Sequence, residues 1–259
     1  MSALIPEIKR ALTADENELR ILINHHSVEI LKNIFLNKNL NEDHVYIIAN
    51  RKNIPSSILE QIFNTNKWKE SYKIILALCR NPRTPEKIAM QILKSLRILD
   101  LAELTRNKQV RISIRSRAEL MICEKILSLP LGIKISIARR ASSNVLVKLI
   151  EDGLKEVVAV CLDNPLLTEG DICKILHLRK TTSSVINMIA RHPKWSSRYE
   201  IQKALIRNNM SPLSIIVNYF DKILTQDLKD LYEDPDVPIS TKPFLYRELF
   251  RRNAIDTKK

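Results

Sequence analysis

The chain has 259 residues, of which 45% are hydrophobic and only 3 are glycine. Scarce glycine argues against all-β folds and dinucleotide-binding folds, because their tight turns and phosphate loops need this residue. The formal charge of +13 is compatible with nucleic acid, an acidic protein or an anionic lipid surface as partner, but charge does not define a fold.

The N-terminal segment 1–17 is expected to form a cap, and its opening MSALIPEIKR lacks the apolar core of a signal peptide. Residues 18–250 are expected to form a single α-helical repeat domain, and residues 251–259 a disordered basic tail. No uncharged apolar stretch approaches the length that spans a bilayer. We therefore expect no membrane association and a cytoplasmic location.

The stretch LCRNPRTPEKIAMQIL (78–93) shows two apolar runs on either side of a turn. The turn has fixed positions: Asn81 as anchor, then Pro82, Thr84 and Pro85. Proline directly after the anchor stops the first helix, and proline four positions on suits the start of the second. Thr84 is then expected to be the N-cap of the second helix.

The same apolar–turn–apolar pattern recurs along the chain. Its anchors are His25, Arg51, Asn81, Asn107, Arg140, Asn164, His192 and Asp234. Successive anchors are 24 to 42 residues apart, and the widest interval is expected to hold an extra helix over 212–224. Apolar residues three positions after the anchor, such as Ile54 and Trp195, are expected to plug the space between turns.

Self-similarity with a period of this size indicates two-helix units that bury their apolar faces by stacking. We predict an all-α fold, a right-handed α-solenoid (αα superhelix) of about eight two-helix repeats.

The copy ALCRNPRTPEKIAMQIL (77–93) resembles the leucine-rich repeat variant family, and residues 18–250 are more loosely similar to HEAT-like α-helical repeats. The resemblance implies an αα superhelix and is nearly silent on function. The intervals here are longer than the units of that family. Some of its members carry an N-terminal iron–sulfur cluster, but the first cysteine here is Cys79, so we expect no cluster and no other cofactor.

Arginine directly precedes the anchor in four copies: Arg80, Arg106, Arg139 and Arg191. In stacked units these positions would form a row, with Arg51 and Arg140 beside it, and such a row is a candidate anion-binding stripe. The alternative is that each arginine only complements the dipole at its helix C-terminus and covers the turn with its stem. Asp163 and Glu233 interrupt the row.

Positive charge is concentrated in residues 101–150, which hold ten Lys or Arg against three Glu. Arg111 and Arg115 share one helix face there. This segment is either a site for an anionic partner or a solvated face that favours solubility.

Trp68 lies between two lysines in an expected loop, where it would stack on a base or cover an apolar edge. Trp195 is expected to pack in the interior. The doublet His25–His26 offers no third metal ligand nearby. The cysteines are expected to be buried free thiols, since each lies in an apolar stretch: Cys79, Cys123, Cys161 and Cys173.

No nucleophile–base–acid set, phosphate loop or zinc motif is readable, so we expect no enzyme and no small-molecule substrate. The favoured function is a non-catalytic scaffold whose curved face binds a partner macromolecule, most simply a protein. The alternatives are a nucleic-acid-binding repeat protein with a basic stripe and, third, a HEAT-like DNA glycosylase. The candidate binding residues are Arg80, Arg106, Arg111, Arg115, Arg139, Arg140, Arg191 and Trp68.

Overall fold

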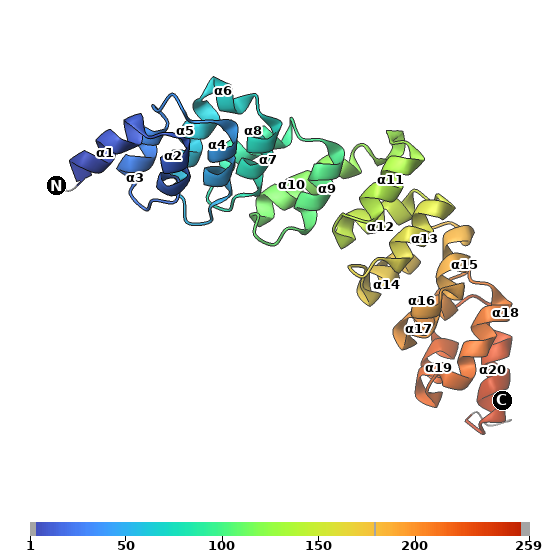
Figure 1. The fold of residues 1–259 in the computed structure, drawn as a ribbon. Coiled ribbons are helices and arrows are strands. Elements are labelled where there is room, and N and C mark those ends of the chain that lie inside the picture. The colour runs from blue at the N-terminus through green and yellow to red at the C-terminus, as the bar shows by residue number, and fades with distance from the viewer. Residues whose placement is uncertain (1–3, 179, 255–259) are drawn as a thin grey trace. The chain divides into compact units, whose positions relative to one another are not determined.

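The computed structural model describes residues 4–178 and 180–254, and all regular secondary structure within them is helical (Figure 1). The prediction of an all-α fold is confirmed. The chain divides into two compact units, Met1–Ile122 and Cys123–Lys259, which we call unit 1 and unit 2 and describe separately. A cap over 1–17 and a repeat domain over 18–250 stay predictions.

Unit 1 is built from ten short helices, and the last of them ends at the unit boundary. They are α1 (Leu4–Thr13), α2 (Glu16–Leu22), α3 (Val28–Ile34), α4 (Glu42–Asn50), α5 (Ser56–Asn64), α6 (Asn66–Lys69), α7 (Tyr72–Arg80), α8 (Glu86–Leu93), α9 (Ile98–Arg106) and α10 (Ile112–Cys123). Helix α1 packs on α3 and α4 packs on α7, so neighbours in space are helices close in sequence.

Unit 2 also contains ten α-helices. They are α11 (Leu131–Ala138), α12 (Ser143–Glu151), α13 (Lys155–Asp163), α14 (Glu169–His177), α15 (Ser183–Arg191), α16 (Pro193–Ser196), α17 (Tyr199–Arg207), α18 (Leu213–Ile216), α19 (Thr225–Glu233) and α20 (Lys242–Arg251). Two 3₁₀ helices, η1 (Ile126–Ser128) and η2 (Val217–Lys222), complete the unit. Helix α18 and η2 fill the interval in which an extra helix was expected.

The C-terminal helix continues further than the sequence suggested. Helix α20 ends at Arg251, and the Arg252 guanidinium donates hydrogen bonds to the Phe220 and Ile223 carbonyls. Arg251 and Arg252 therefore belong to the folded unit. The remainder of the tail expected over 251–259 lies, from residue 255, outside the described residues.

The helices of unit 2 repeat those of unit 1 at a constant distance in sequence. Helices α4, α5, α6, α7 and α9 begin and end 127 positions before α14, α15, α16, α17 and α19. Aligned with itself at this shift and without gaps, the chain has the same residue at 32 of 132 positions. An identity of one quarter together with matching helix bounds identifies the two units as copies of one ten-helix module.

Six of the eight anchors end a helix by adopting extended backbone angles. His25 and Arg140 do not, because α2 ends at Leu22 and Arg139 keeps helical angles. Asn81, with φ −78° and ψ 123°, is followed by proline, but Asn107 and Asn208 adopt similar angles without one. In all three, the carboxamide Oδ1 accepts the backbone N–H two residues later, at 2.9–3.0 Å. This Asx turn, rather than the proline, is the feature that these helix ends share.

Thr84 is not the N-cap of the following helix, as the sequence suggested. Pro85 occupies that position, and the buried Thr84 hydroxyl instead donates to the Leu78 carbonyl at 2.6 Å. The physical reason is that the last carbonyls of α7 lack helical partners, and the Thr84 side chain satisfies one of them. Thr181 makes the same hydrogen bond to Ile175, at 2.7 Å.

The apolar residues three positions after five of the anchors pack in the interior, as predicted, whereas Val28, which follows His25, is half-buried. Their exposed fractions are between 1% and 4% for Ile54, Val110, Leu167, Trp195 and Val237. Each of these five turns therefore places one side chain in the core, which fixes the turn against the helices on either side.

Candidate functional site

Side-chain donors join successive turns within unit 1. The Asn81 carboxamide Nδ2 donates to the Ala49 and Arg51 carbonyls at 2.7 and 2.9 Å. The Arg51 guanidinium in turn donates to the Ile23 and His25 carbonyls. These contacts supply hydrogen-bond donors to carbonyl groups at the ends of the preceding helices, where no helical N–H is available. They also place the turns at 23–25, 51–54 and 81–84 beside one another.

The same contacts recur in unit 2 at the shift of 127 positions. Asn208, the counterpart of Asn81, donates from Nδ2 to the Leu176 carbonyl at 2.6 Å. Asn164 donates to Ala138 at 2.7 Å, and its counterpart Asn37 donates to Ala11 at 2.9 Å. Turn-to-turn hydrogen bonding is therefore a property of the module and not of one unit.

A second hydrogen-bond arrangement, present in both units, joins a tyrosine to the start of a later helix. The Tyr72 hydroxyl donates to Asp100 and accepts the Arg97 N–H at 3.0 Å. The Tyr199 hydroxyl likewise donates to Asp227 and accepts the Leu224 N–H at 3.0 Å. Burial, followed by the hydrogen bond to the carboxylate, raises the pKa of both tyrosines, while the Tyr199 hydroxyl lowers the pKa of Asp227.

Two arginines of the expected stripe are used inside the fold. Arg80 Nη2 lies 2.8 Å from Glu103 Oε2 and 3.9 Å from Asp100 Oδ1. Its counterpart Arg207 lies 2.8 Å from Asp234 Oδ2, and that hydrogen bond lowers the pKa of the Asp234 carboxyl. Arg51 is occupied by backbone carbonyls, and burial lowers its pKa. These guanidinium groups connect neighbouring helices.

The remaining candidates of unit 1 are more accessible. Arg106 is exposed, and its side chain has no hydrogen-bond or ion-pair partner among the described residues. Arg111 is exposed, with Nη1 4.0 Å from Glu86 Oε2. Arg115 is half-buried, and its Nε atom is buried without a hydrogen-bond partner in the described part of the chain.

Three further candidates belong to unit 2. Arg139 is exposed beside Asp163 and Asn164, and Arg191 is exposed with Nε 2.8 Å from Asn187 Oδ1. Arg140 is half-buried and donates to the Ser136 carbonyl at 3.3 Å. Arg140 does not occupy an anchor position, because α11 ends at Ala138 and Arg139 keeps helical backbone angles.

Trp68 is placed differently from the expectation. It lies in the one-turn helix α6, not in a loop, and only 5% of it is exposed. Lys67 Nζ lies 4.4 Å from the ring centroid, and Lys194 lies at 4.0 Å over the counterpart Trp195. A buried ring cannot stack on a base, so Trp68 is a core residue in this structure.

The basic segment 101–150 is less uniform than its composition suggests. Lys134 is buried in unit 2, where its Nζ lies 2.7 Å from Asp152 Oδ2. The segment also crosses the boundary between the two units. Its exposed cations therefore have to be considered unit by unit.

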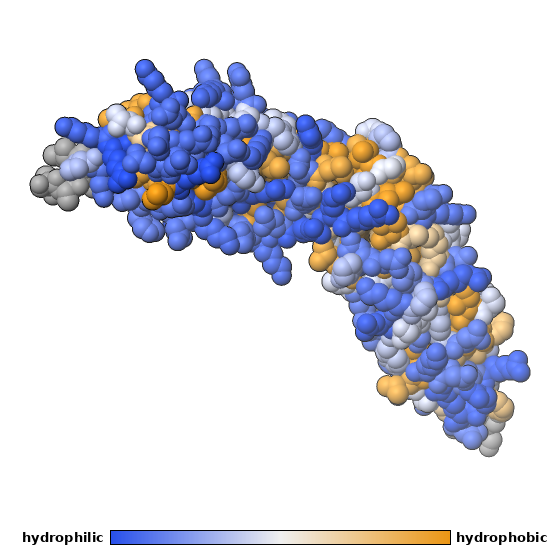
Figure 2. Space-filling model, viewed as in Figure 1, coloured by the Kyte–Doolittle hydropathy of each residue, from blue (hydrophilic) through white to orange (hydrophobic). Residues whose placement is uncertain are grey.

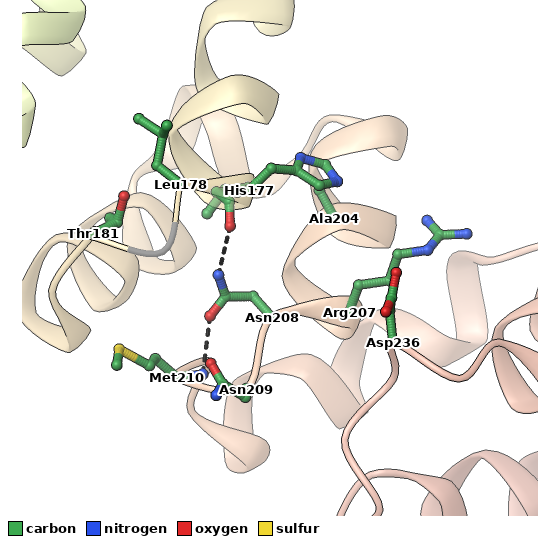
Figure 3. Close-up of a pocket in the computed structure, with 10 residues that line it drawn as sticks. His177, Leu178, Thr181, Ala204, Arg207, Asn208, Asn209, Met210 and Asp236 are labelled. Carbon is green, nitrogen blue, oxygen red and sulfur yellow. Dashed lines mark hydrogen bonds between the residues drawn. The ribbon is translucent and has the colours of Figure 1, made fainter.

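A cavity with a volume of about 390 Å³ lies in unit 2 (Figure 3). Its polar lining is formed by His177, Thr181, Arg207, Asn208, Asn209 and Asp236. Figure 3 shows the two hydrogen bonds of Asn208 along one wall: it donates to the Leu176 carbonyl of the preceding turn and accepts the Met210 N–H within its own turn. Arg207 is paired with Asp234, and His177 Nδ1 lies 2.6 Å from the Cys173 carbonyl. Both side chains therefore already make contacts that stabilise the fold.

The cysteines are free thiols, as expected. Cys79 and Cys161 are buried, and burial raises the pKa of each to about 12, whereas Cys123 and Cys173 are half-buried. Within the described ranges, no three His, Cys, Asp or Glu side chains are grouped so that they could hold a metal ion.

No family model, curated protein or solved structure matches the chain. The resemblance to leucine-rich repeat variant and HEAT-like proteins therefore stays a prediction. Among the residues that the structure describes, no helix has the length and apolar character needed to cross a membrane.

Proposed function

We propose that the chain is a non-catalytic helical-repeat scaffold that binds a partner protein through its curved face. The observation that carries the proposal is the row of turn-to-turn hydrogen bonds, such as Asn81 to Ala49 and Asn208 to Leu176. Such bonds join several turns to the turn before them, and this supports the predicted right-handed α-solenoid of two-helix repeats. Stacks of this kind offer long binding surfaces for other macromolecules.

The paired arginine and tyrosine side chains fit a structural role, which agrees with a non-catalytic binding protein. Arg80, Arg207 and Tyr199 are each paired with a carboxylate of a neighbouring helix, so they stabilise the stack. The buried thiols of Cys79 and Cys161 fit a reducing compartment, and we propose the cytoplasm as the location.

Nucleic-acid binding is the second candidate function. It is supported by the exposed cations Arg106, Lys108 and Arg117 around the turn between α9 and α10. Contacts of this kind with phosphates weaken steeply with salt, which separates this candidate from the first.

The proposal is tested by capture on the immobilised full chain, in parallel with and without nuclease treatment of the extract. The expected result is a retained protein that, after purification, forms a stoichiometric complex with the chain in isothermal titration calorimetry. Retention that disappears after nuclease treatment, with binding of purified nucleic acid in its place, would contradict a protein-binding function.

A further inference from the structure

We propose that one edge of unit 1 binds an extended acidic segment of a partner protein, an inference that rests on the proposed protein-binding function. The edge consists of the turns that follow α4, α7 and α9. Its exposed cations are Lys52, Arg83, Arg106 and Lys108, and we call this set the basic edge.

The three turns follow one another in the fold. Asn81 donates to the Arg51 carbonyl at 2.9 Å, which joins the first turn to the second. Arg80, at the end of α7, pairs with Glu103 of α9 at 2.8 Å, and Arg111 approaches Glu86 at 4.0 Å. These contacts hold the second turn beside the third.

The cations of the basic edge are available to a ligand. All four are exposed, and no carboxylate in the described part of the chain lies within ion-pair distance of any of them. Exposed amide side chains of Asn53 and Gln109 flank two of the lysines. Figure 2 shows hydrophilic residues over most of the visible surface of unit 1, consistent with a surface that binds through charge and hydrogen bonds.

Unit 2 shows that the fold does not require three of these cations. The counterparts of Arg83, Arg106 and Lys108, 127 positions later, are Met210, Glu233 and Pro235. The counterpart of Gln109 is Asp236, whereas that of Lys52 is Arg179, so the sequence keeps a cation at this one position. The turns nevertheless have the same helix bounds and the same Asn81-type hydrogen bonds. The positive charge of Arg83, Arg106 and Lys108 is therefore not needed to form these turns and is available for binding.

The spacing of the turns fits an extended acidic polypeptide. Packed helices lie about 8–10 Å apart, so successive turns present cations at about that interval. A polypeptide in the extended polyproline II conformation has about three residues per turn and advances about 3.1 Å per residue, so carboxylates at every third position lie on one face about 9 Å apart and would meet each cation in turn. Duplex DNA, with one charge per about 1.7 Å, is far more densely charged than this edge.

The aromatic residues of unit 1 argue against a single-stranded nucleic acid. Such ligands are held largely by stacking of bases on exposed rings. The five aromatic side chains are buried or half-buried: Phe35, Tyr46, Phe63, Trp68 and Tyr72. The basic edge thus offers charge without a stacking surface.

The test uses the full chain and a fluorescent peptide with glutamate at every third position, titrated by anisotropy at about 150 mM salt. The edge variant carries the residues of unit 2, Arg83→Met with Arg106→Glu. We expect it to bind about tenfold more weakly, because it loses two exposed ion pairs and gains a repulsion. The matched control, Lys155→Met with Lys222→Glu, changes the net charge equally at exposed sites of unit 2 and should leave the affinity nearly unchanged.

An equal loss in the control variant would overturn the proposal, because it would show that only net charge matters. Tighter binding of an oligonucleotide of equal charge than of the peptide would overturn it in favour of nucleic acid. If the edge variant still binds a captured partner protein as the native chain does, the assignment of the binding surface to the basic edge is wrong, but the protein-binding function stands. If the native chain captures no protein, the function itself fails.

Discussion

Replacing Asn81 with alanine is expected to lower the free energy of unfolding of unit 1 by about 2–4 kcal/mol. Asn81 is 7% exposed, donates to the Ala49 and Arg51 carbonyls, and accepts the Arg83 N–H. Each buried hydrogen bond contributes about 1 kcal/mol, and the groups left without a partner add their own desolvation cost. The loss should therefore exceed that of an ordinary surface turn.

Asn107→Ala is the matched control for this prediction. The Asn107 side chain only accepts the Gln109 N–H among the described residues, so its loss should be below about 1 kcal/mol. Urea denaturation followed by far-ultraviolet circular dichroism measures both variants. Equal losses would refute the reasoning, because they would show that the turn itself, and not donation to the preceding turn, provides the stabilisation.

Asn81→Asp tests the direction of the same hydrogen bonds. The new carboxylate oxygen would face the Ala49 and Arg51 carbonyls, and this repulsion raises its pKa in the folded chain above the unfolded value of about 3.9. Relative to the native chain, the variant should be most stable below about pH 4 and should lose stability as the pH rises through the raised pKa. A relative gain in stability on raising the pH would contradict this geometry.

Three other predictions follow from buried and paired groups. Lys134→Met should leave the free energy of unfolding, measured by urea denaturation, nearly unchanged. Asp152→Asn leaves the buried Lys134 ammonium group without its partner and should lower that free energy by about 3–5 kcal/mol, and equal effects of the two variants would contradict this reasoning. The thiols of Cys79 and Cys161, with pKa values of about 12, should resist a disulfide reagent until urea is added, and fast native reaction would contradict their burial. The lowered pKa of Asp227 gives stability that is present above about pH 4 and is lost as the pH falls through the pKa of the folded chain. Asp227→Asn should therefore make the free energy of unfolding depend less on pH below about pH 4.

The helical class and the buried third positions were predictable because they depend on local pattern. Apolar residues such as Ile54 and Val110 stand at fixed distances from a turn, and this spacing decides which side chains reach the core. The helix end at Asn81 was also readable, since Pro82 disfavours continuation. Asn208 ends its helix by the same Asx turn, but it lacks both the following proline and an apolar residue at the third position, which is Ser211, so the sequence pattern missed it.

The duplication was hidden by the choice of anchors. Asn164 and His192 are counterparts of Asn37 and Thr65, which did not match the pattern, whereas Asn81 is the counterpart of the missed Asn208. The eight anchors therefore mixed different turns of the module, which explains their irregular spacing. A comparison of the chain with itself at every shift would have found the interval of 127.

The partners of the candidate arginines could not be read from sequence. Arg80 meets Glu103, 23 positions away, and Arg51 meets carbonyls 26 and 28 positions away. Such contacts depend on how neighbouring helix pairs stack, and local spacing does not encode that arrangement. The free cation Arg106 and the paired Arg80 occupy the same position of the pattern, and only the packed structure separates them.

Hydrogen exchange of the full chain with and without the glutamate peptide tests the basic edge most directly. The account predicts slower exchange at the turns 51–54, 81–84 and 107–110, and no change at the described counterparts 208–211 and 234–237, which share the helix bounds but lack the cations. Protection of the unit 2 turns, or uniform protection of both units, would contradict the assignment of the binding surface to unit 1.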